Sequence, residues 1–207
     1  MPLLVHVERL ATHDTVLIRQ LDLQVAAGDI HTVMGASGSG KSSLLSAICG
    51  TLPPGLHFEG TVRLDGRRID DLPTERRKVG ILFQDDLLFA HMTVAENLLF
   101  AVPAGPGAQR RAQVAAGLAD LELTALANAN PATLSGGQRA RVALMRALLA
   151  EPKALLLDEP FSRLDAALRE RVRDFVFALV RKRGIPALMV THDDADIADP
   201  MHLTLLS

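Results

Sequence analysis

The sequence predicts an α/β fold with a parallel core sheet, an N-terminal antiparallel β subdomain and an inserted α-helical lobe. Three observations support this prediction. A glycine-rich loop lies between an apolar run and a helical segment, other apolar runs end in polar side chains, and the middle of the chain has helical composition. We expect one domain over residues 1–207, with the core and the β subdomain in 1–84 and 134–207 and the helical lobe in about 85–133.

The glycine-rich loop has the spacing G-x-x-x-x-G-K-[ST] of a phosphate-binding loop. Glycines let backbone N–H groups approach phosphate oxygens, and the N-terminus of the following helix attracts anions. We expect Lys41 to reach the β- and γ-phosphates of a nucleotide and Ser42 to bind Mg²⁺. The pattern predicts a site that binds a nucleoside triphosphate, and by itself it is compatible with kinases, GTPases and helicases. The residues predicted to contact the nucleotide here are Gly35, Ala36, Ser37, Gly38, Ser39, Gly40, Lys41, Ser42 and Ser43.

Short apolar runs on both sides of this loop predict strands. Residues 3–10 and 15–25 alternate in part between apolar and polar side chains, which predicts a small antiparallel sheet. Residues 60–66 alternate and end in Asp-Gly, which is typical of a strand followed by a tight turn. Residues 79–83 form a continuous apolar run that fits a buried strand.

The middle of the chain is predicted to be helical. Thr93 and Glu96 have the spacing of a capping box, which indicates that a helix begins there. Residues 103–107 contain prolines and glycines that end this helix. Residues 109–127 are rich in alanine, leucine and arginine, so we expect a second helix, followed by a loop at 128–133.

Polar side chains follow three apolar runs at the point where each run ends. These side chains are Gln84, the pair Asp158 and Glu159, and His192. A lone histidine is more often structural, and two acids at a strand end can simply be solvated. If the runs are adjacent parallel strands, however, these groups meet the phosphate loop at one edge of the sheet. One carboxylate can then hold Mg²⁺ while the other polarises an attacking water.

Residues 134–138 read Leu-Ser-Gly-Gly-Gln and precede a segment with helical periodicity. The small residues and the serine leave backbone N–H groups and a hydroxyl available to bind an anion. The same residues also fit a serine that only caps the helix, with flexible glycines after it. Both interpretations stay open on these residues alone.

Composition limits the classes of partner. The net charge of −2 gives no reason to expect nucleic-acid binding through a basic surface. The single cysteine, Cys49, excludes an intrachain disulfide. No apolar run approaches the ~20 residues that span a bilayer, and the N-terminus does not resemble a signal peptide. We therefore expect a cytosolic protein that reaches a membrane only through a partner.

Taken in order, these motifs resemble those of the ATP-binding cassette (ABC) ATPases over nearly the full chain. The matching segments are residues 35–42 (Walker A), Gln84 (Q-loop), 134–138 (signature), 154–160 (Walker B), 162–165 (D-loop) and His192 (switch histidine). Within this family the chain is most similar to the compact ATP-binding subunits of bacterial uptake systems.

The resemblance implies that two cassettes dimerise head to tail, with ATP held between the Walker A loop of one and the signature helix of the other. Glu159 would then be the catalytic carboxylate, His192 would contact the γ-phosphate, and Gln84 would sense Mg²⁺ and the transported state. The implied ligands of Mg²⁺ are Ser42, Gln84 and Asp158. The residues implied to clamp the partner's ATP or to link the two sites are Ser135, Gly136, Gly137, Gln138 and Asp165.

The implied partners are a second cassette in a homodimer, integral-membrane permease subunits and, through the permease, a periplasmic or surface solute-binding protein. The implied location is cytoplasmic, at the inner face of the cell membrane, and no nucleic acid is involved. The alternative is a non-transport ABC ATPase with an envelope mechanotransmission role or a soluble role. The single cassette and the lack of coiled-coil arms argue against chromosome-maintenance and ribosome-associated roles.

Two further stretches are relevant to the family comparison. Residues 11–14 contain no aromatic side chain where family members stack one on adenine. We therefore expect weaker adenine affinity or a relaxed preference for ATP over GTP, with His13 as a substitute platform. Residues 85–92 mix acids with apolar side chains and fit either a docking patch or the polar edge of the lobe core. The resemblance favours docking of a permease helix.

Overall fold

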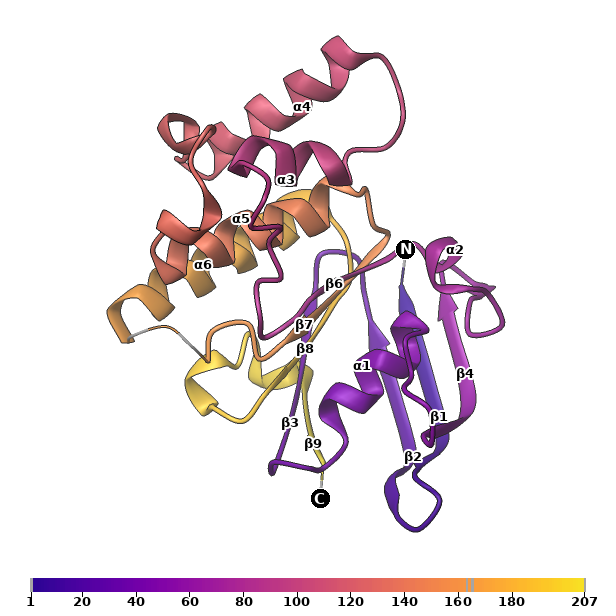
Figure 1. The fold of residues 1–207 in the computed structure, drawn as a ribbon. Helices are drawn as coiled ribbons and strands as arrows, with labels where there is room; N and C mark the ends of the chain where they lie inside the picture. Colours follow the sequence, from indigo (N-terminus) through magenta and orange to yellow (C-terminus); the bar gives the residue numbers. More distant parts are fainter. Residues whose placement is uncertain (1, 163, 165, 207) are drawn as a thin grey trace. The chain divides into compact units, whose positions relative to one another are not determined.

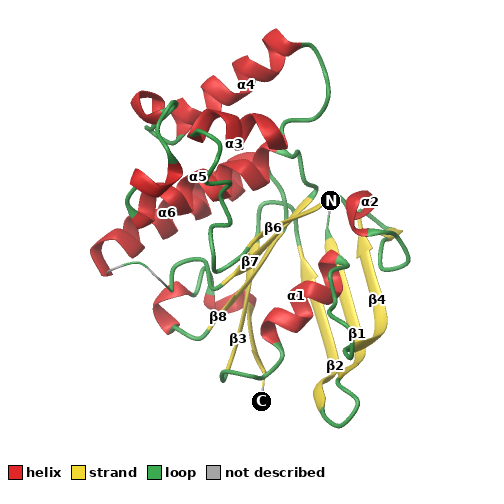
Figure 2. Cartoon of the chain, in the orientation of Figure 1, coloured by secondary structure: helices red, strands yellow, loops and turns green. Residues whose placement is uncertain are grey.

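The computed structural model describes residues 2–162, 164 and 166–206. The chain divides into two compact units. The first consists of Met1–Ile81, Lys153–Glu159 and Phe177–Ser207, and the second of Leu82–Pro152 and Pro160–Val176. Strands dominate the first unit and helices the second (Figures 1 and 2). The helical unit thus includes residues on both sides of the expected 85–133 stretch, and the assignment of one domain stays a prediction.

The predicted parallel core sheet is confirmed. It has five strands in the order β6-β7-β8-β3-β9. The strands are β3 (Ile30–Gly35), β6 (Val79–Leu82), β7 (Ala154–Asp158), β8 (Ala187–Thr191) and β9 (Leu203–Leu206). Parallel pairing joins β7 to β8, β8 to β3 and β3 to β9. Strands β7 and β8 are buried along nearly their whole length, as expected for apolar strands inside a parallel sheet.

The second sheet is antiparallel and has four strands in the order β2-β1-β4-β5. They are β1 (Leu3–Ala11), β2 (Val16–Val25), β4 (His57–Leu64) and β5 (Arg67–Arg68). Alternate side chains of β1 are buried and form a core with α1 (Lys41–Cys49). The predicted N-terminal antiparallel sheet and the turn at Asp65 and Gly66 are therefore confirmed.

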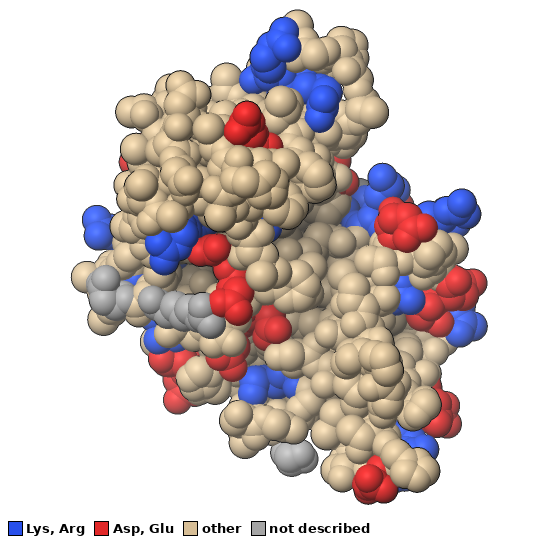
Figure 3. Space-filling view, in the orientation of Figure 1, with Lys and Arg blue, Asp and Glu red and all other residues tan. Residues whose placement is uncertain are grey.

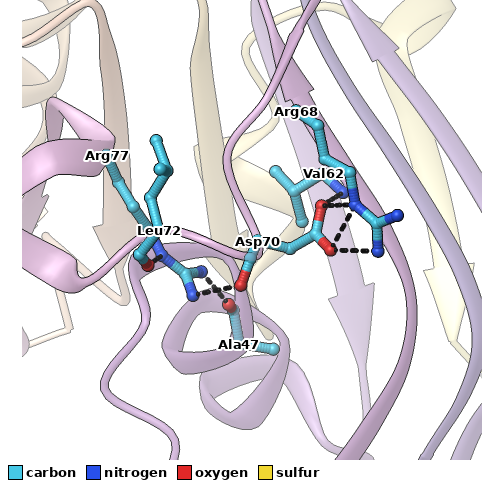
Figure 4. A network of polar contacts seen from close by, with 6 residues as sticks. All are labelled: Ala47, Val62, Arg68, Asp70, Leu72 and Arg77. Carbon is cyan, nitrogen blue, oxygen red and sulfur yellow. Dashed lines mark hydrogen bonds and ion pairs between the residues drawn. The ribbon is translucent and has the colours of Figure 1, made fainter.

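A buried arginine joins the short helix α2 (Thr74–Arg77) to the end of α1. Arg77 is only 9% exposed, and its guanidinium donates to the carbonyls of Ala47 and Ile48 at 2.8 and 2.9 Å. It also donates to the carbonyls of Leu72 and Asp70, both at 2.8 Å (Figure 4). These bonds satisfy carbonyls that the last turn of α1 leaves without helical partners.

We expect Arg77→Gln to lower the free energy of unfolding by about 2–4 kcal/mol, because several buried carbonyls lose a charged donor at once. Urea unfolding followed by circular dichroism measures this loss. Arg19→Gln is the matched control, since it removes the same charge from an exposed position on β2 and should change stability by less than about 0.5 kcal/mol. Equal losses in the two variants would contradict the structural role of Arg77.

The helical unit contains α3 (Val94–Ala101), α4 (Gly107–Asp120), α5 (Gly136–Leu149) and the first part of α6 (Ala166–Arg183). Helix α3 packs on α4 and α5, and α4 packs on α5. The capping box is confirmed, because Thr93 Oγ1 accepts from the Glu96 N–H at 3.2 Å and Glu96 Oε2 accepts from the Thr93 N–H at 2.7 Å. No helix in the described ranges is long and apolar enough to cross a membrane.

The predicted helix at 109–127 is shorter than expected. Helix α4 ends at Asp120, and a separate turn of 3₁₀-helix covers Thr124–Leu126. Glu122 between them has a φ of 58°. This left-handed residue lets Leu121 and Leu123, which flank it, both be buried, so packing overrides the helical propensity of the segment.

Candidate active site

The phosphate loop connects β3 to α1, and its backbone geometry requires glycine at several positions. Gly38 and Gly40 have φ angles of 83° and 91°, which favour glycine. A Cβ at Gly35 would lie 2.7 Å from Ser39 Oγ, and one at Gly40 would lie 2.9 Å from the Cβ of Leu17. Gly40 also has no side chain to cap α1, so the first N–H groups of the helix remain available to an anion.

Two side chains of this loop fit a phosphate ligand. Lys41 is 6% exposed, and its ammonium donates to the carbonyls of Gly35 and Ala36 at 2.7 and 2.9 Å. The buried hydroxyl of Ser39 has no hydrogen-bond partner among the described residues. Since a buried polar group without a partner is costly, this hydroxyl fits a site built for an oxygen-rich ligand.

Ser42 and Asp158 lie together, as the predicted metal site requires. The Ser42 hydroxyl donates to Asp158 Oδ1 at 3.0 Å. Burial raises the pKa of Asp158, the neighbouring Glu159 raises it further, and the Ser42 hydrogen bond and Lys41 oppose this rise. A hydroxyl and a carboxylate are oxygen ligands of the kind that Mg²⁺ binds together with phosphate oxygens. The residues therefore fit Mg²⁺ bound to a nucleotide.

Glu159 and His192 form the second half of the site. Glu159 follows β7 with a φ of 44°, and its N–H donates to the carbonyl of Val190 on β8 at 3.0 Å. This strained conformation is of the kind that persists at functional sites. The Glu159 carboxylate lies 3.1 Å from His192 Nδ1, and His192 follows the end of β8. The expected meeting of strand ends at one sheet edge is confirmed for β3, β7 and β8.

Sequence reasoning missed the group that supports His192. The Thr191 hydroxyl donates to the carboxylate of Asp196 at 2.9 Å and accepts from the Asp193 N–H at 3.2 Å. Both Thr191 and Asp196 are buried. These bonds hold the chain on either side of His192. The sequence does show an aspartate, Asp196, shortly after the strand-end histidine. Its burial, which is what makes it a supporting group, is visible only in the structure.

The helical unit contains Gln84 and the residues of the signature segment. Gln84 follows β6, and its amide donates to the Ser162 hydroxyl at 3.4 Å. Arg163 and Asp165 of the expected D-loop lie outside the described residues.

The signature segment forms the start of α5. Ser135 is its N-cap and accepts from the Gln138 N–H at 3.3 Å, while Gln138 Oε1 accepts from the Ser135 N–H at 2.8 Å. The capping interpretation is therefore correct locally. Gly136 and Gly137 are helical, and a Cβ at Gly137 would lie 2.7 Å from Leu168. Gly137 thus allows close packing, and an exposed Ser135 beside glycines still leaves this helix end open to an anion.

The N-terminal hairpin borders the phosphate loop. His13 lies in the exposed turn between β1 and β2, and Leu17 on β2 approaches Gly40. An aliphatic side chain thus stands beside the start of α1. A role for His13 in base recognition stays a prediction.

A phosphate loop between strand and helix, with Ser42, Asp158 and Glu159 beside it, defines a P-loop nucleoside triphosphatase. The family model described as ABC transporter matches residues 18–162. The chain therefore belongs to the ABC transporter family, as an ATP-binding subunit and an ATP hydrolase of the ABC type.

Curated relatives agree with this assignment. The uncharacterized ABC transporter ATP-binding protein YnjD of Escherichia coli is 53% identical over 182 residues, which cover 87% of this chain and 84% of YnjD. The thiamine import ATP-binding protein ThiQ of Cereibacter sphaeroides is 40% identical, covering 98% of this chain and 87% of ThiQ. The sulfate/thiosulfate import ATP-binding protein CysA of Thermosynechococcus vestitus is 41% identical, and this chain spans only 53% of its length.

Proposed function

We propose that this chain is the ATP-hydrolysing subunit of a bacterial importer and that Mg-ATP drives two copies together. The observation that carries the proposal is the group of side chains at one edge of the parallel sheet. There the Ser42 hydroxyl bonds Asp158, and the Glu159 carboxylate contacts His192. Purified chain that releases no inorganic phosphate from Mg-ATP at any protein concentration would refute the proposal.

Each side chain has a separate task in the proposed reaction. Lys41 and the loop N–H groups bind the phosphates, and Ser42 and Asp158 hold the metal. Mg²⁺, when bound, neutralises part of the charge on the phosphate oxygens. Glu159 orients the attacking water by accepting a hydrogen bond from it, and His192 positions Glu159 and contacts the γ-phosphate.

The proposed site needs a second chain. Ser135 and the first N–H groups of α5 bind the ATP held by the Walker A loop of the other copy, with Gly136, Gly137 and Gln138 forming the rest of this clamp. Asp165 links the two sites, and Gln84 joins Ser42 and Asp158 as a metal ligand and sensor. The support is that α1 begins without a side-chain cap at the Walker A motif, and that α5 begins with an exposed serine and two glycines at the signature motif.

We propose import because the relatives named above with known roles are import ATP-binding proteins. The partners are then integral-membrane permease subunits and, through them, a periplasmic or surface solute-binding protein. The chain acts in the cytoplasm at the inner face of the membrane. Residues 1–207 act as one ABC ATPase domain, in which the helical subdomain at about 85–133 carries the docking surface.

An exposed apolar surface of the helical unit is proposed to receive the permease. Leu87 is 54% exposed and Phe100 is 63% exposed, and the Phe100 ring packs edge-on against Phe89 at 5.0 Å. Arg146 fixes this segment by donating to the carbonyl of Leu87 at 2.8 Å, and Asn97 accepts from the Phe89 N–H at 2.8 Å. The backbone is therefore held while apolar side chains stay exposed, as at a binding surface.

We expect Leu87→Asp to reduce the share of the protein found in the membrane fraction of its host cells by about tenfold, because a charge replaces an apolar contact. Membrane sedimentation and immunoblotting measure this share. Met201→Asp is the matched control, since Met201 is 87% exposed in the other unit and the substitution adds the same charge. An undiminished membrane share for Leu87→Asp would argue against docking here.

A further inference from the structure

The strand-rich unit has a hollow of about 160 Å³ that the ATPase site does not use. Its basic side chains come from the stretch 64–78 and from Lys153, which is distant from that stretch in sequence. Arg67 comes from β5, Arg76 from α2, Lys78 from the residue after α2, and Lys153 from the residue before β7. Figure 3 shows basic side chains gathered around α2, with acidic ones among them.

The four cations around the hollow lack partners within the structure. In the described part of the chain, the side chains of Arg67, Arg76, Lys78 and Lys153 form no hydrogen bond or ion pair. Among the described residues that line the hollow, Asp65 is the one acid. The neighbouring Arg68 differs from these four cations, because its guanidinium forms an ion pair with the Asp70 carboxylate at 2.7 Å.

A backbone hydrogen bond joins two of the segments that carry these cations. The Lys153 N–H donates to the carbonyl of Lys78 at 2.8 Å, which fixes the spacing of two of the four positions. Arg77 forms part of the same wall, but its guanidinium is occupied by carbonyls of α1 and of the 70–72 segment. The backbone of the wall is thus held at these positions, and the exposed cations that remain point to a ligand from outside the chain.

The hollow is separate from the phosphate loop. Arg77 contacts Ala47 and Ile48 in the last turn of α1, whereas Lys41 and Ser42 lie in its first turn. At 1.5 Å per residue, these turns are about 9 Å apart along the helix axis. The phosphates of a nucleotide bound at the phosphate loop therefore do not neutralise the four cations around the hollow.

We propose that this hollow binds a phosphate-bearing anion. Four like charges around one concave surface repel one another, and an anion with several oxygens removes that repulsion. Arginine offers paired N–H donors to phosphate oxygens, and lysine adds point charges beside them. The phosphate comes from a soluble phosphate compound or from an anionic lipid headgroup, since both present the same oxygens.

Pyrophosphate titration by calorimetry tests the proposal on the full chain, with and without saturating Mg-ADP. Without nucleotide we expect two classes of site, and ADP should remove only the one at the phosphate loop. The double variant Arg76→Gln/Lys153→Gln should weaken the ADP-insensitive site by about tenfold or more. The matched control Arg181→Gln/Arg183→Gln removes the same charge from an exposed helix end and should leave that site unchanged.

Vesicle sedimentation distinguishes the two sources. Phosphatidylcholine vesicles with and without phosphatidylglycerol are compared for the wild type and both double variants. If the wild type binds only the vesicles with phosphatidylglycerol, and Arg76→Gln/Lys153→Gln loses this binding, the ligand is a lipid headgroup. If the wild type binds pyrophosphate but not the anionic vesicles, the ligand is a soluble phosphate compound. If the wild type bound neither anionic vesicles nor pyrophosphate at an ADP-insensitive site, the proposal would be overturned. An equal loss of binding in the two double variants would also overturn it. A chain that binds no ADP would instead count against the ATPase site.

Discussion

Glu159→Gln is expected to lower the rate of ATP hydrolysis by about 10²–10⁴-fold, the range typical for loss of a general base. The amide keeps the size of the side chain, but it is a much weaker acceptor for the proton of an attacking water. ATP binding should persist, because Lys41, Ser42 and Asp158 are unchanged. Phosphate release and nucleotide binding measured on the same preparation separate the two effects.

A control variant makes this result specific to the site. Glu8 lies exposed on β1, so Glu8→Gln removes the same charge without touching the sheet edge that holds Glu159. It should hydrolyse ATP at the wild-type rate. If Glu159→Gln also kept the wild-type rate, Glu159 would not be the catalytic carboxylate, and the contact with His192 would be structural only.

Two inactive variants are expected to regain activity when mixed. Lys41→Ala should abolish phosphate binding at the loop, and Ser135→Asp should repel the phosphate at the start of α5. In a head-to-tail heterodimer of the two, one site combines an intact Lys41 with an intact Ser135. Equal mixing makes about half of the dimers mixed with one working site each, so about a quarter of the wild-type rate should return. Phosphate release at a fixed total protein concentration measures this recovery.

The substitution Ser135→Asp keeps a capping residue at the start of α5 while it adds a negative charge there. Aspartate caps helices as well as serine does, so α5 should keep its N-terminus. Ser135→Asn is the matched control, because it keeps the cap and the shape without the charge and should be more active than Ser135→Asp. If no activity returned on mixing, the site would be complete within one chain or the dimer would have another arrangement.

The strand-to-helix transition at residues 35–42 and the capping box at Thr93 were predictable because they depend on local rules. Glycines permit positive φ angles, and a threonine three residues before a glutamate satisfies N–H groups at a helix start. Strand β9 was not predicted. Its Leu-Thr-Leu-Leu sequence carries no distinctive pattern, and pairing with β3 alone makes it a strand. The end of α4 was also placed wrongly, since burial of Leu121 and Leu123 decides it.

The sequence by itself determined the class of fold, the phosphate loop and the order of the motifs, because short-range spacing and family resemblance carry that information. Only the tertiary structure decided which of these residues meet. Ser42 donates a hydrogen bond to Asp158, the Glu159 carboxylate contacts His192, and Arg77 bonds to the end of α1. The basic hollow likewise exists only because Lys153 comes to lie beside the stretch 64–78. Contacts between residues far apart in the chain depend on strand order and packing, which no local pattern specifies.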